Sequence, residues 1–316
     1  MKLFIKKKNN LNKNNLIIIG GTGFIGFNLI KKFIKKKKFN ILSLSSNKPS
    51  KPRKLKGVNY LICDIFKKKK LETILNKEKI DYVINLAGYV DHKNKDKTFK
   101  SHYIGCKNLV EIFKKKKIKR FIQIGSSVEY GFKKSPQKEN CIINIKDLKS
   151  PYGQAKLNAT NLLMKTFKSE NFPAVVLRLY IAYGPHQNDN RFIPEVINAC
   201  LKNKVFNCSH GHQIRDFIYI NDLVDLIYKC LKIKNIDGNI FNVGSGKKQI
   251  IKNIIQFIIK KTSGGKPQFG KIKLRHDEPL KLYPNISKIK KFINWKPKIS
   301  FNKGLDETIK YYKNAQ

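Results

Sequence analysis

The alternation of short apolar runs with longer amphipathic stretches is the feature that most constrains the fold of this chain. The runs are bounded by Gly, Ser or Asp, and they comprise residues 16–21, 39–45, 58–64, 81–88, 119–127 and 174–180. Runs of this length, separated by helical segments, predict a parallel sheet with right-handed crossover connections. Because the runs are largely continuous, we expect helices on both faces of the sheet. The predicted fold class is α/β, doubly wound.

The pattern loosens after about residue 185, where loops rich in Asn, His, Gly and Pro replace it. A late strand is predicted within "GNIFNVGSG", residues 238–246. We therefore expect a basic N-terminal tail at residues 1–15 and a main α/β domain at residues 16–184. Residues 185–316 are expected to form mostly a smaller lobe that binds a substrate, with some elements returning to the main sheet.

The net charge of +46 raises the question of a nucleic-acid partner. The chain holds 67 Lys and Arg residues, of which only six are Arg, and most Lys residues occur in runs such as "KKFIKKKK". These runs fall where helix ends and turns are expected, so we interpret them as solvated faces and expect no nucleic-acid partner. The few Arg residues deserve more weight, because a planar guanidinium donates paired hydrogen bonds.

Composition also limits the environment and the kinds of site. With 316 residues, 41% of them hydrophobic, the chain can bury the core of an enzyme. It contains no apolar window of about 18 residues and no signal-peptide core, so we expect a soluble cytoplasmic protein without membrane contact. Its six Cys and six His residues show no metal-ligand spacing, which predicts reduced thiols and no metal site.

The segment "GGTGFIG" follows the first predicted strand directly and precedes a helix. Glycines spaced by three residues permit a tight turn, close approach of backbone N–H groups to a pyrophosphate, and close helix packing. Together with the strand before it and the helix after it, this segment predicts a Rossmann dinucleotide site. The expected cofactor residues in it are Gly20, Gly23, Phe24, Ile25 and Gly26.

The end of the second predicted strand bears on the choice of cofactor. An NAD enzyme usually places an acidic residue there to bind the ribose 2′-hydroxyl, whereas this chain has Ser45 and Ser46. No carboxylate repels a 2′-phosphate, and Arg53 or Lys48 could neutralise one. We therefore favour NADP(H), with NAD(H) possible. The alternative is that Arg53 and Lys48 are ordinary solvated cations.

Two later strand ends supply further candidate cofactor contacts. Asp64 follows the third strand and could accept a hydrogen bond from the adenine amino group, with Ile65 beside it. The small residues of "NLAG", which include Leu86, Ala87 and Gly88, are expected to pass along the cofactor.

A tyrosine and a lysine four residues apart occur in "SPYGQAKLNAT", where a proline begins a predicted helix. A free tyrosine has a pKa of about 10, so it acts near neutrality only when a cation stabilises its phenolate. Lys156 lies one helical turn after Tyr152 and can supply that charge, and it can also reach a nicotinamide ribose. Taken in isolation, the same spacing is more often a surface pair.

Several motifs, in this order and spacing, give the chain a strong resemblance to a known family. The motifs are "GGTGFIG", "NLAG", "IGSSVEYG", "PYGQAK", "RLYIAYGP", "RDFIYINDLVDLI", "FNVGSG" and "NWKP". The chain resembles the extended short-chain dehydrogenase/reductase family of NAD(P)-dependent nucleotide-sugar epimerases, dehydratases and reductases. The resemblance implies an enzyme that binds a nucleoside diphosphate sugar in its C-terminal lobe and forms a homodimer.

The same resemblance assigns catalytic roles. It implies that Tyr152 exchanges a proton with a sugar oxygen while a hydride moves between the sugar and the nicotinamide, with Lys156 beside it. Ser126 matches the catalytic Ser or Thr of the family and would hydrogen-bond the same oxygen. Ser127 is its neighbour and a candidate substrate contact, as is Tyr180.

Departures from the family pattern limit which of the family's reactions we expect. The 4,6-dehydratases carry acidic residues directly after the catalytic Thr, whereas this chain has Ser127 and Val128. We therefore predict NADPH-dependent reduction of a 4-keto-6-deoxyhexose on a nucleoside diphosphate, as in reductases of the CDP-abequose synthase type. The alternative is a 4-epimerase of the UDP-glucose type with bound NAD.

Three arginines are expected around the nucleotide. By resemblance, Arg215 and Arg275 meet the diphosphate and Arg191 lies in a covering loop. The alternative is structural: Arg215 would pair with Asp216 or Asp222, and Arg275 with Asp277 or Glu278. Ile181 and His102 stand where the family usually has Asn, which predicts a less polar sugar pocket that suits a deoxysugar.

Overall fold

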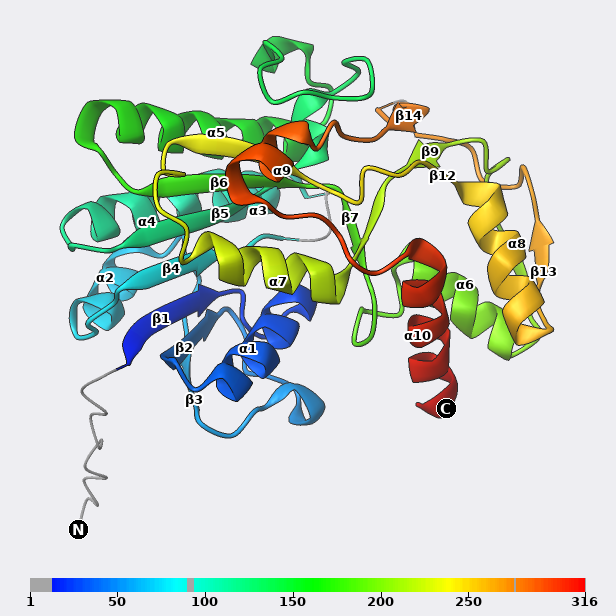
Figure 1. Ribbon diagram of the computed structural model, residues 1–316, viewed down its shortest axis with the longest axis horizontal. Helices are drawn as coiled ribbons and strands as arrows, with labels where there is room; N and C mark the ends of the chain where they lie inside the picture. Colours follow the sequence, from blue (N-terminus) through cyan, green and yellow to red (C-terminus); the bar gives the residue numbers. More distant parts are fainter. Residues whose placement is uncertain (1–12, 90–93, 276, 316) are drawn as a thin grey trace.

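The computed structural model describes residues 13–89, 94–275 and 277–315, and a seven-stranded sheet forms its centre (Figure 1). The strand order is β11-β6-β5-β4-β1-β2-β3, and every neighbouring pair in it is parallel. The strands are β1 (Asn14–Ile19), β2 (Phe39–Ser45), β3 (Val58–Ile62), β4 (Tyr82–Asn85), β5 (Arg120–Ser126), β6 (Ala174–Leu179) and β11 (Asn239–Val243). This order is that of the doubly wound Rossmann sheet, so the predicted fold class is confirmed.

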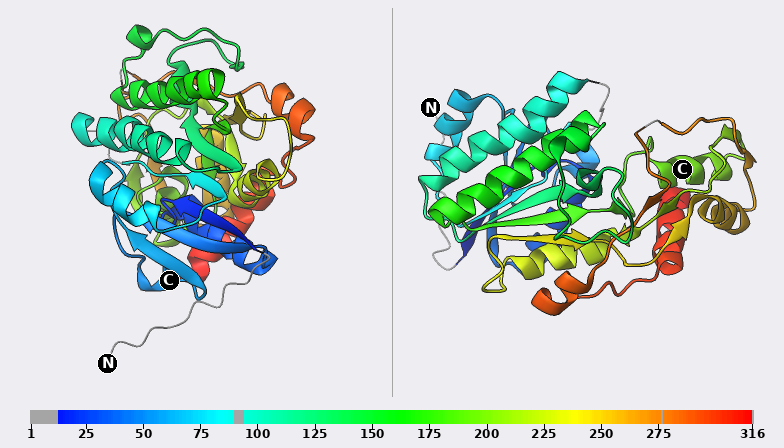
Figure 2. Two further views of the ribbon diagram at one scale, coloured as in Figure 1. Left: turned by 90° about the vertical axis from the view of Figure 1, so that its left-hand side faces the viewer. Right: turned by 90° about the horizontal axis from the view of Figure 1, so that it is seen from above.

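Helices cover both faces of this sheet because its strands are apolar on both sides. In β1, Leu16 and Ile18 contact one core cluster, and Ile17 and Ile19 contact the other. The first cluster includes residues of α1 (Phe24–Lys36) and α7 (Ile220–Cys230). The second includes residues of α2 (Lys68–Asn76), α4 (Gly105–Lys114) and α5 (Pro151–Glu170). Figure 2 shows α4 and α5 side by side, on the face of the sheet opposite to α7.

The approach to α4 is irregular. A short helix, α3 (Lys95–Phe99), continues through one π-helical segment, Lys100–Ile104, before α4 begins. π-Helical turns of this kind are rare and often occur at functional sites. The segment contains His102, whose side chain is buried.

A second group of elements lies beyond the carboxyl ends of the strands (Figure 1). Its helices are α6 (Phe192–Leu201), α8 (Ile251–Thr262) and α10 (Phe301–Asn314). Its short strands form three small sheets, β10 (Phe217–Tyr219) with β7 (Ile181–Tyr183), β12 (Gln249–Ile250) with β9 (Ile214–Arg215) and β14 (Lys281–Leu282), and β13 (Lys266–Gln268) with β8 (Val205–Asn207).

The chain after residue 184 is divided between the two groups of elements. The strand β11 joins the edge of the main sheet beside β6, and α7 packs on α1. The helix α9 (Ser287–Ile293) packs on β11. Because of these returns, one hydrophobic cluster runs continuously from the main sheet into the second group.

The parallel sheet also determines where polar side chains can gather. Loops at the carboxyl ends of β1, β4, β5 and β6 open on the same edge, which faces the second group of elements (Figure 1).

Within the described residues, no helix is both long and apolar enough to span a membrane. The six cysteines are free thiols.

Candidate active site

The glycine-rich loop after β1 adopts a path that side chains would block. Gly20 has a φ of +82°, and a Cβ added there would lie 3.1 Å from the backbone nitrogen of Ala87. A Cβ on Gly26 would lie 2.4 Å from the carbonyl oxygen of Gly20. Glycine at these two positions therefore permits the tight turn and the close approach of α1 to β1.

The amino end of α1 fits an anionic group. Gly23 is its N-cap, and in this part of the described chain no side chain caps the helix and no acidic residue lies in its first turn. The first backbone N–H groups, including those of Phe24 and Ile25, are therefore available to a pyrophosphate. The glycine path and the uncapped helix together fit a dinucleotide.

Predicted cofactor residues at the second and third strand ends lie around this loop. The hydroxyl of Ser45 is buried and accepts a hydrogen bond from the backbone nitrogen of Thr22 at 3.3 Å, while Ser46 is exposed. Asp64 is half-buried after β3, and Ile65 is buried beneath it.

The segment after β4 forms the other side of the crevice. Leu86 and Ala87 are half-buried and Gly88 is exposed. The backbone nitrogen of Leu86 donates to the carbonyl of Ile19, and that of Ala87 to the side chain of Asn85. These bonds fix the segment against β1, next to the glycine-rich loop.

Arg53 lies beside the glycine-rich loop, but protein oxygens engage its guanidinium. Its Nη1 donates to the carbonyl of Thr22 at 3.1 Å. Its Nη2 donates to the carbonyl of His186 at 2.7 Å and to Oδ1 of Asn188 at 2.9 Å. The predicted contact with a 2′-phosphate would compete with these three bonds.

Ser126 is the last residue of β5 and the N-cap of a short 3-10 helix, Ser127–Tyr130. Its hydroxyl accepts from the backbone nitrogen of Val128 at 3.4 Å, and its own backbone nitrogen donates to Oε1 of Glu129 at 2.7 Å. This reciprocal arrangement is a capping box, and it fixes the direction of the chain as it leaves the sheet.

Tyr152 and Lys156 lie in the first turns of α5, as predicted. Ser150 caps the helix and Pro151 is its first residue. Lys156 is buried, and its Nζ donates to the carbonyl of Ile124 at 2.8 Å. The same Nζ lies 5.8 Å from the centre of the Tyr152 ring. The ammonium group thus links the middle of β5 to the helix that carries the tyrosine.

The start of α5 packs directly against the segment after Ser126. A Cβ on Gly153 would lie 2.9 Å from the carbonyl oxygen of Val128, so glycine allows this approach. The structure therefore brings Ser126, Tyr152 and Lys156 together at the carboxyl edge of the sheet, the same edge at which the glycine-rich loop leaves β1. Their catalytic roles remain predictions.

His102 lies closer to this group than the sequence indicated. Its ring packs edge-on against Tyr152, with 4.9 Å between ring centres, and Nε2 lies 3.1 Å from the carbonyl of Tyr89. The ring also covers Gly88, where an added Cβ would lie 1.8 Å from Cε1. The sequence indicated only that His102 replaces the usual Asn, so its contact with Tyr152 was not anticipated.

Sequence reasoning missed the buried ion pair beneath the site. Glu129 is fully buried, and its Oε2 accepts from Thr160 and from Nε of Arg178, each at 2.8 Å. These residues belong to the segment after β5, to α5 and to β6. The pair therefore joins the three elements that surround Ser126. The spacing of Ser126 and Glu129, that of a capping box, was the signal available in the sequence.

The predicted substrate residues nearest the sheet are enclosed. Ser127 and Tyr180 are both buried, and the hydroxyl of Tyr180 donates to Oε1 of Gln137 at 2.7 Å. Burial also raises the pKa of Tyr180. Arg191 is half-buried at the N-cap position of α6.

The structure brings Arg215 and Arg275 to one carboxylate. The Nη2 of Arg215 lies 2.6 Å from Oε1 of Glu278, while Nε of Arg275 lies 3.7 Å from Oε2. The expected structural partners of Arg215 were therefore wrong. Asp216 instead accepts from Ser245, and Asp222 accepts from the backbone of residues 298 and 299. The prediction considered only carboxylates near Arg215 in sequence, whereas Glu278 is 63 residues away.

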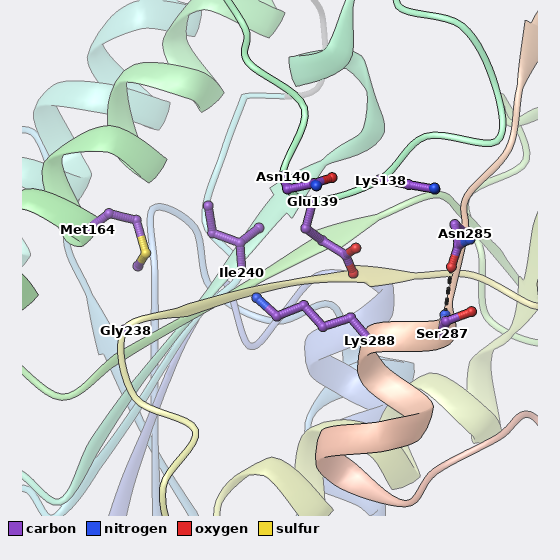
Figure 3. Close-up of a pocket in the computed structure, with 9 residues that line it drawn as sticks. All are labelled: Lys138, Glu139, Asn140, Met164, Gly238, Ile240, Asn285, Ser287 and Lys288. Atoms are coloured by element: carbon purple, nitrogen blue, oxygen red, sulfur yellow. Dashed lines mark hydrogen bonds between the residues drawn. The ribbon is translucent and has the colours of Figure 1, made fainter.

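A separate cavity of about 610 Å³ lies along the open edge of β11 (Figure 3). It is bordered by Met164 of α5, Ile240 of β11 and Lys288 of α9, with Glu139 on the facing loop. None of the predicted site residues lines it, so this cavity is distinct from the candidate active site.

Comparisons with known proteins agree with this geometry. The sequence model of the NAD dependent epimerase/dehydratase family matches residues 16–244. A dTDP-D-glucose 4,6-dehydratase of Dictyostelium discoideum is 28% identical, over 98% of this chain and 84% of its own length. An uncharacterized UDP-glucose epimerase of Bacillus subtilis is also 28% identical, over 94% of this chain and 97% of its own.

Solved structures of sugar-nucleotide epimerases have the same fold as this chain. The UDP-glucuronic acid 4-epimerase of Bacillus cereus, in complex with UDP-glucuronic acid and NAD, superposes with a TM-score of 0.87 at 25% identity, over 96% of this chain and all of that one. A UDP-glucose 4-epimerase of Thermotoga maritima with UDP-glucose superposes with a TM-score of 0.88 at 23% identity, over 95% of this chain and 99% of that one.

Proposed function

Because the chain belongs to the NAD dependent epimerase/dehydratase family, we propose that it exchanges a hydride between a nicotinamide and C4 of a nucleotide-linked sugar, without eliminating water. One observation carries this proposal. Ser126, Tyr152 and Lys156 lie together at the sheet edge that also carries an uncapped helix and a glycine path that fit a dinucleotide. Glu129, the carboxylate nearest to Ser126 in sequence, is fully buried.

The state of Glu129 is the argument against dehydration. Elimination of water across C5 and C6 needs an acid close to the catalytic hydroxyl, and the two residues after Ser126 are Ser127 and Val128. Glu129 is the next residue, but it is fully buried and bound to Arg178 and Thr160. The segment directly after Ser126 therefore offers no free acid for the elimination of water.

Each residue has a distinct part in the proposed reaction. Tyr152 donates or accepts the proton of the C4 oxygen, and the Ser126 hydroxyl donates a hydrogen bond to that oxygen. Lys156 places its ammonium beside the Tyr152 ring and stabilises the charge left when the proton moves. The glycine-rich loop and the amino end of α1 would hold the dinucleotide, whose nicotinamide supplies or accepts the hydride when bound.

Within this class we favour a reductase that uses NADPH on a 4-keto-6-deoxyhexose joined to a nucleoside diphosphate, as in enzymes of the CDP-abequose synthase type. The end of β2 presents Ser45 and Ser46 in place of an acidic residue, which supports a 2′-phosphate. Ile181 and His102 replace two amides expected near the sugar, which supports a substrate with fewer hydroxyl groups.

A 4-epimerase is the second candidate, and two of the compared proteins support it. The Bacillus subtilis relative is described as a UDP-glucose epimerase, and the Bacillus cereus structure holds NAD together with its sugar nucleotide. An epimerase oxidises C4 and reduces it again from the other side, so it would use the same three residues twice and keep its cofactor.

The purified protein separates these reactions. Any nucleotide that co-purifies is identified. The protein is then supplied with NADPH or NADH and a 4-keto-6-deoxyhexose nucleotide, with UDP-glucose alone, or with dTDP-glucose alone. An empty site and NADPH oxidation that depends on the keto-sugar would support the reductase. Retained NAD(H) with interconversion of C4 epimers would establish the epimerase instead. Release of a 4-keto-6-deoxy product from dTDP-glucose would refute the proposed absence of dehydration.

A further inference from the structure

A loop of residues 184–191 connects β7 to α6 and lies against the glycine-rich loop. Arg53, in the segment after β2, bonds to both of them. It donates to Thr22 in the glycine-rich loop, and to His186 and Asn188 in the loop before α6, over distances of 2.7 to 3.1 Å. One guanidinium therefore bridges the dinucleotide loop and a segment whose His186 is 133 residues from Arg53 in sequence.

Aromatic contacts hold the far side of this loop. The His186 ring lies 4.7 Å from the Phe27 ring of α1 and 4.6 Å from the Tyr311 ring of α10, measured between ring centres. The Tyr311 hydroxyl is 2.9 Å from Nδ1 of His186, and the Tyr312 hydroxyl donates to the carbonyl of Gln187. These contacts fix the loop to α1 and α10, whereas Arg53 fixes it to the dinucleotide loop.

The bonds of Arg53 bear on its predicted role. A guanidinium binds phosphate with the same paired donors that it uses for other oxygens. Here Nη1 already has one acceptor and Nη2 has two, and all three are supplied by the protein. Both paired edges of the guanidinium include Nη2, so a bidentate contact with a 2′-phosphate would require Arg53 to give up its bond to His186 or to Asn188.

We propose that Arg53 is a positioning residue that ties the dinucleotide loop to the loop before α6. It supports dinucleotide binding by fixing Thr22. By holding the loop of residues 184–191, it also fixes the position of Arg191 and of the start of α6. It does not read the 2′-phosphate, so the choice between NADP and NAD depends on other residues at the end of β2. The inference rests on the dinucleotide site of the proposed function.

The proposal predicts an equal loss for both cofactors. Replacing Arg53 by Met removes three hydrogen bonds from a charged donor, which solvent weakens because the group is half-buried. We expect Arg53→Met to weaken NADPH and NADH by about 10-fold each, with their affinity ratio unchanged within about 2-fold. If Arg53 instead bound the 2′-phosphate, the variant would lose affinity for NADPH alone.

The test uses the full-length protein and three variants. Arg53→Met removes the guanidinium that joins the two loops, which we call the Arg53 clamp. Asn188→Ala removes one of its acceptors in the loop before α6. Lys54→Met removes a neighbouring exposed charge without removing any of these bonds. Affinities for NADPH and NADH are measured by nicotinamide fluorescence, and amide hydrogen exchange of residues 184–191 is measured without any ligand.

Support requires three results together: equal losses for the two cofactors in Arg53→Met, faster exchange at residues 184–191 in both Arg53→Met and Asn188→Ala, and neither change in Lys54→Met. A selective loss of NADPH affinity of about 10-fold or more in Arg53→Met would overturn the proposal. So would unchanged exchange in Arg53→Met, or equal effects in Lys54→Met. If the wild-type protein binds neither dinucleotide, the proposed function fails, while the exchange measurement still tests the clamp.

Discussion

The dinucleotide half of the site and the arginine cluster of the second lobe are organised differently. Ser126 and Lys156 are each held by a hydrogen bond between a side chain and the backbone, Ser126 with Glu129 and Lys156 with the carbonyl of Ile124. Both residues, like Tyr152, lie in a recognisable short motif. Arg215 and Arg275 are joined by Glu278, and the bond from Arg215 spans 63 residues of sequence. Backbone geometry determines the first arrangement, whereas a long-range side-chain pair determines the second.

The two arginines also differ from each other in their surroundings. The Arg215 side chain is 6% exposed, and burial lowers its pKa while Glu278 opposes that effect. The Arg275 side chain is 68% exposed and lies farther from Glu278. A buried guanidinium keeps its geometry when a ligand arrives, while an exposed one must be ordered by it. We therefore expect the substrate side of the site to be the more adaptable one.

The largest effect is expected in the dinucleotide half. Tyr152→Phe removes the proton donor while leaving the α5 packing intact, so it should lower kcat by about 10³-fold. Dinucleotide affinity should change by less than about 3-fold, because the ring and Lys156 remain. Tyr103→Phe, in the π-helical segment, serves as the control. Retention of more than a tenth of the kcat in Tyr152→Phe would contradict the assigned role.

The buried pair beneath Ser126 should have the next largest effect, measured by urea unfolding. Glu129→Gln leaves the Arg178 charge uncompensated in the core, which is expected to lower the free energy of unfolding by about 3 kcal/mol. The surface pair of Lys114 with Glu170 is the matched control, and Glu170→Gln should change stability by less than about 0.5 kcal/mol. Equal losses of unfolding free energy in the two variants would show that the buried Glu129 pair stabilises the fold no more than a surface pair does.

Asp216 provides a buried carboxylate in the second lobe that hydroxyl and backbone donors satisfy. Burial raises its pKa to about 6, above the ordinary value of 3.8. Because the folded state holds this proton more tightly, Asp216 contributes stability that is full below about pH 4 and is lost as the pH rises through 6.

Unfolding experiments on wild type and Asp216→Asn at pH 4 and pH 7 measure that contribution. The stability of wild type relative to the variant should fall by about 2 kcal/mol between these pH values. The exposed Asp306, replaced by Asn, serves as the control and should give no such change. A difference that grows with pH would reverse the sign assigned to Asp216.

Arg215→Met tests the substrate side directly. If this guanidinium binds the diphosphate, the variant should bind UDP or dTDP about 10-fold more weakly, because a charged hydrogen bond is lost. NADPH affinity should stay within about 2-fold. The variant's unfolding free energy is measured in parallel. An unchanged nucleotide affinity in a folded variant would assign Arg215 to the structural pair with Glu278 alone.

The smallest effect is expected for Arg275→Met. Its exposed side chain gives a weak, screened attraction, so nucleotide affinity should fall by about 3-fold at low salt and less at high salt. Titrations at two ionic strengths measure this dependence. A loss as large as that of Arg215→Met would remove the distinction drawn between the two arginines.

The sequence predicted the scaffold well because its signals are local. Each predicted strand is present, the glycine path has the expected turn and packing, and Tyr152 lies in the first turn of its helix. The main disagreement at the start of the chain is a boundary: β1 begins at Asn14, inside the predicted tail of residues 1–15. Residues 1–12 lie outside the described residues.

Pairings between distant segments could not be read from the sequence. The capping box of Ser126 is local, but the pairing of Glu129 with Arg178 depends on β5 and β6 being neighbours. Likewise, the partner of Arg215 was sought among adjacent aspartates and lies instead at Glu278. The position of His102 against Tyr152 depends on how α3, the π-helical segment and α5 pack.

The sequence by itself therefore determined the doubly wound sheet and the glycine-rich loop, and its motifs made Ser126, Tyr152 and Lys156 the candidates for the proposed reaction. Hydrophobic periodicity and glycine spacing act within a few residues, so they can be read along the chain. Only the tertiary structure decided which acids Arg178 and Arg215 meet, which carboxylate is sealed from the site, and which two loops Arg53 joins. Those outcomes depend on burial and on the distances between segments, and spacing along the chain encodes neither of them.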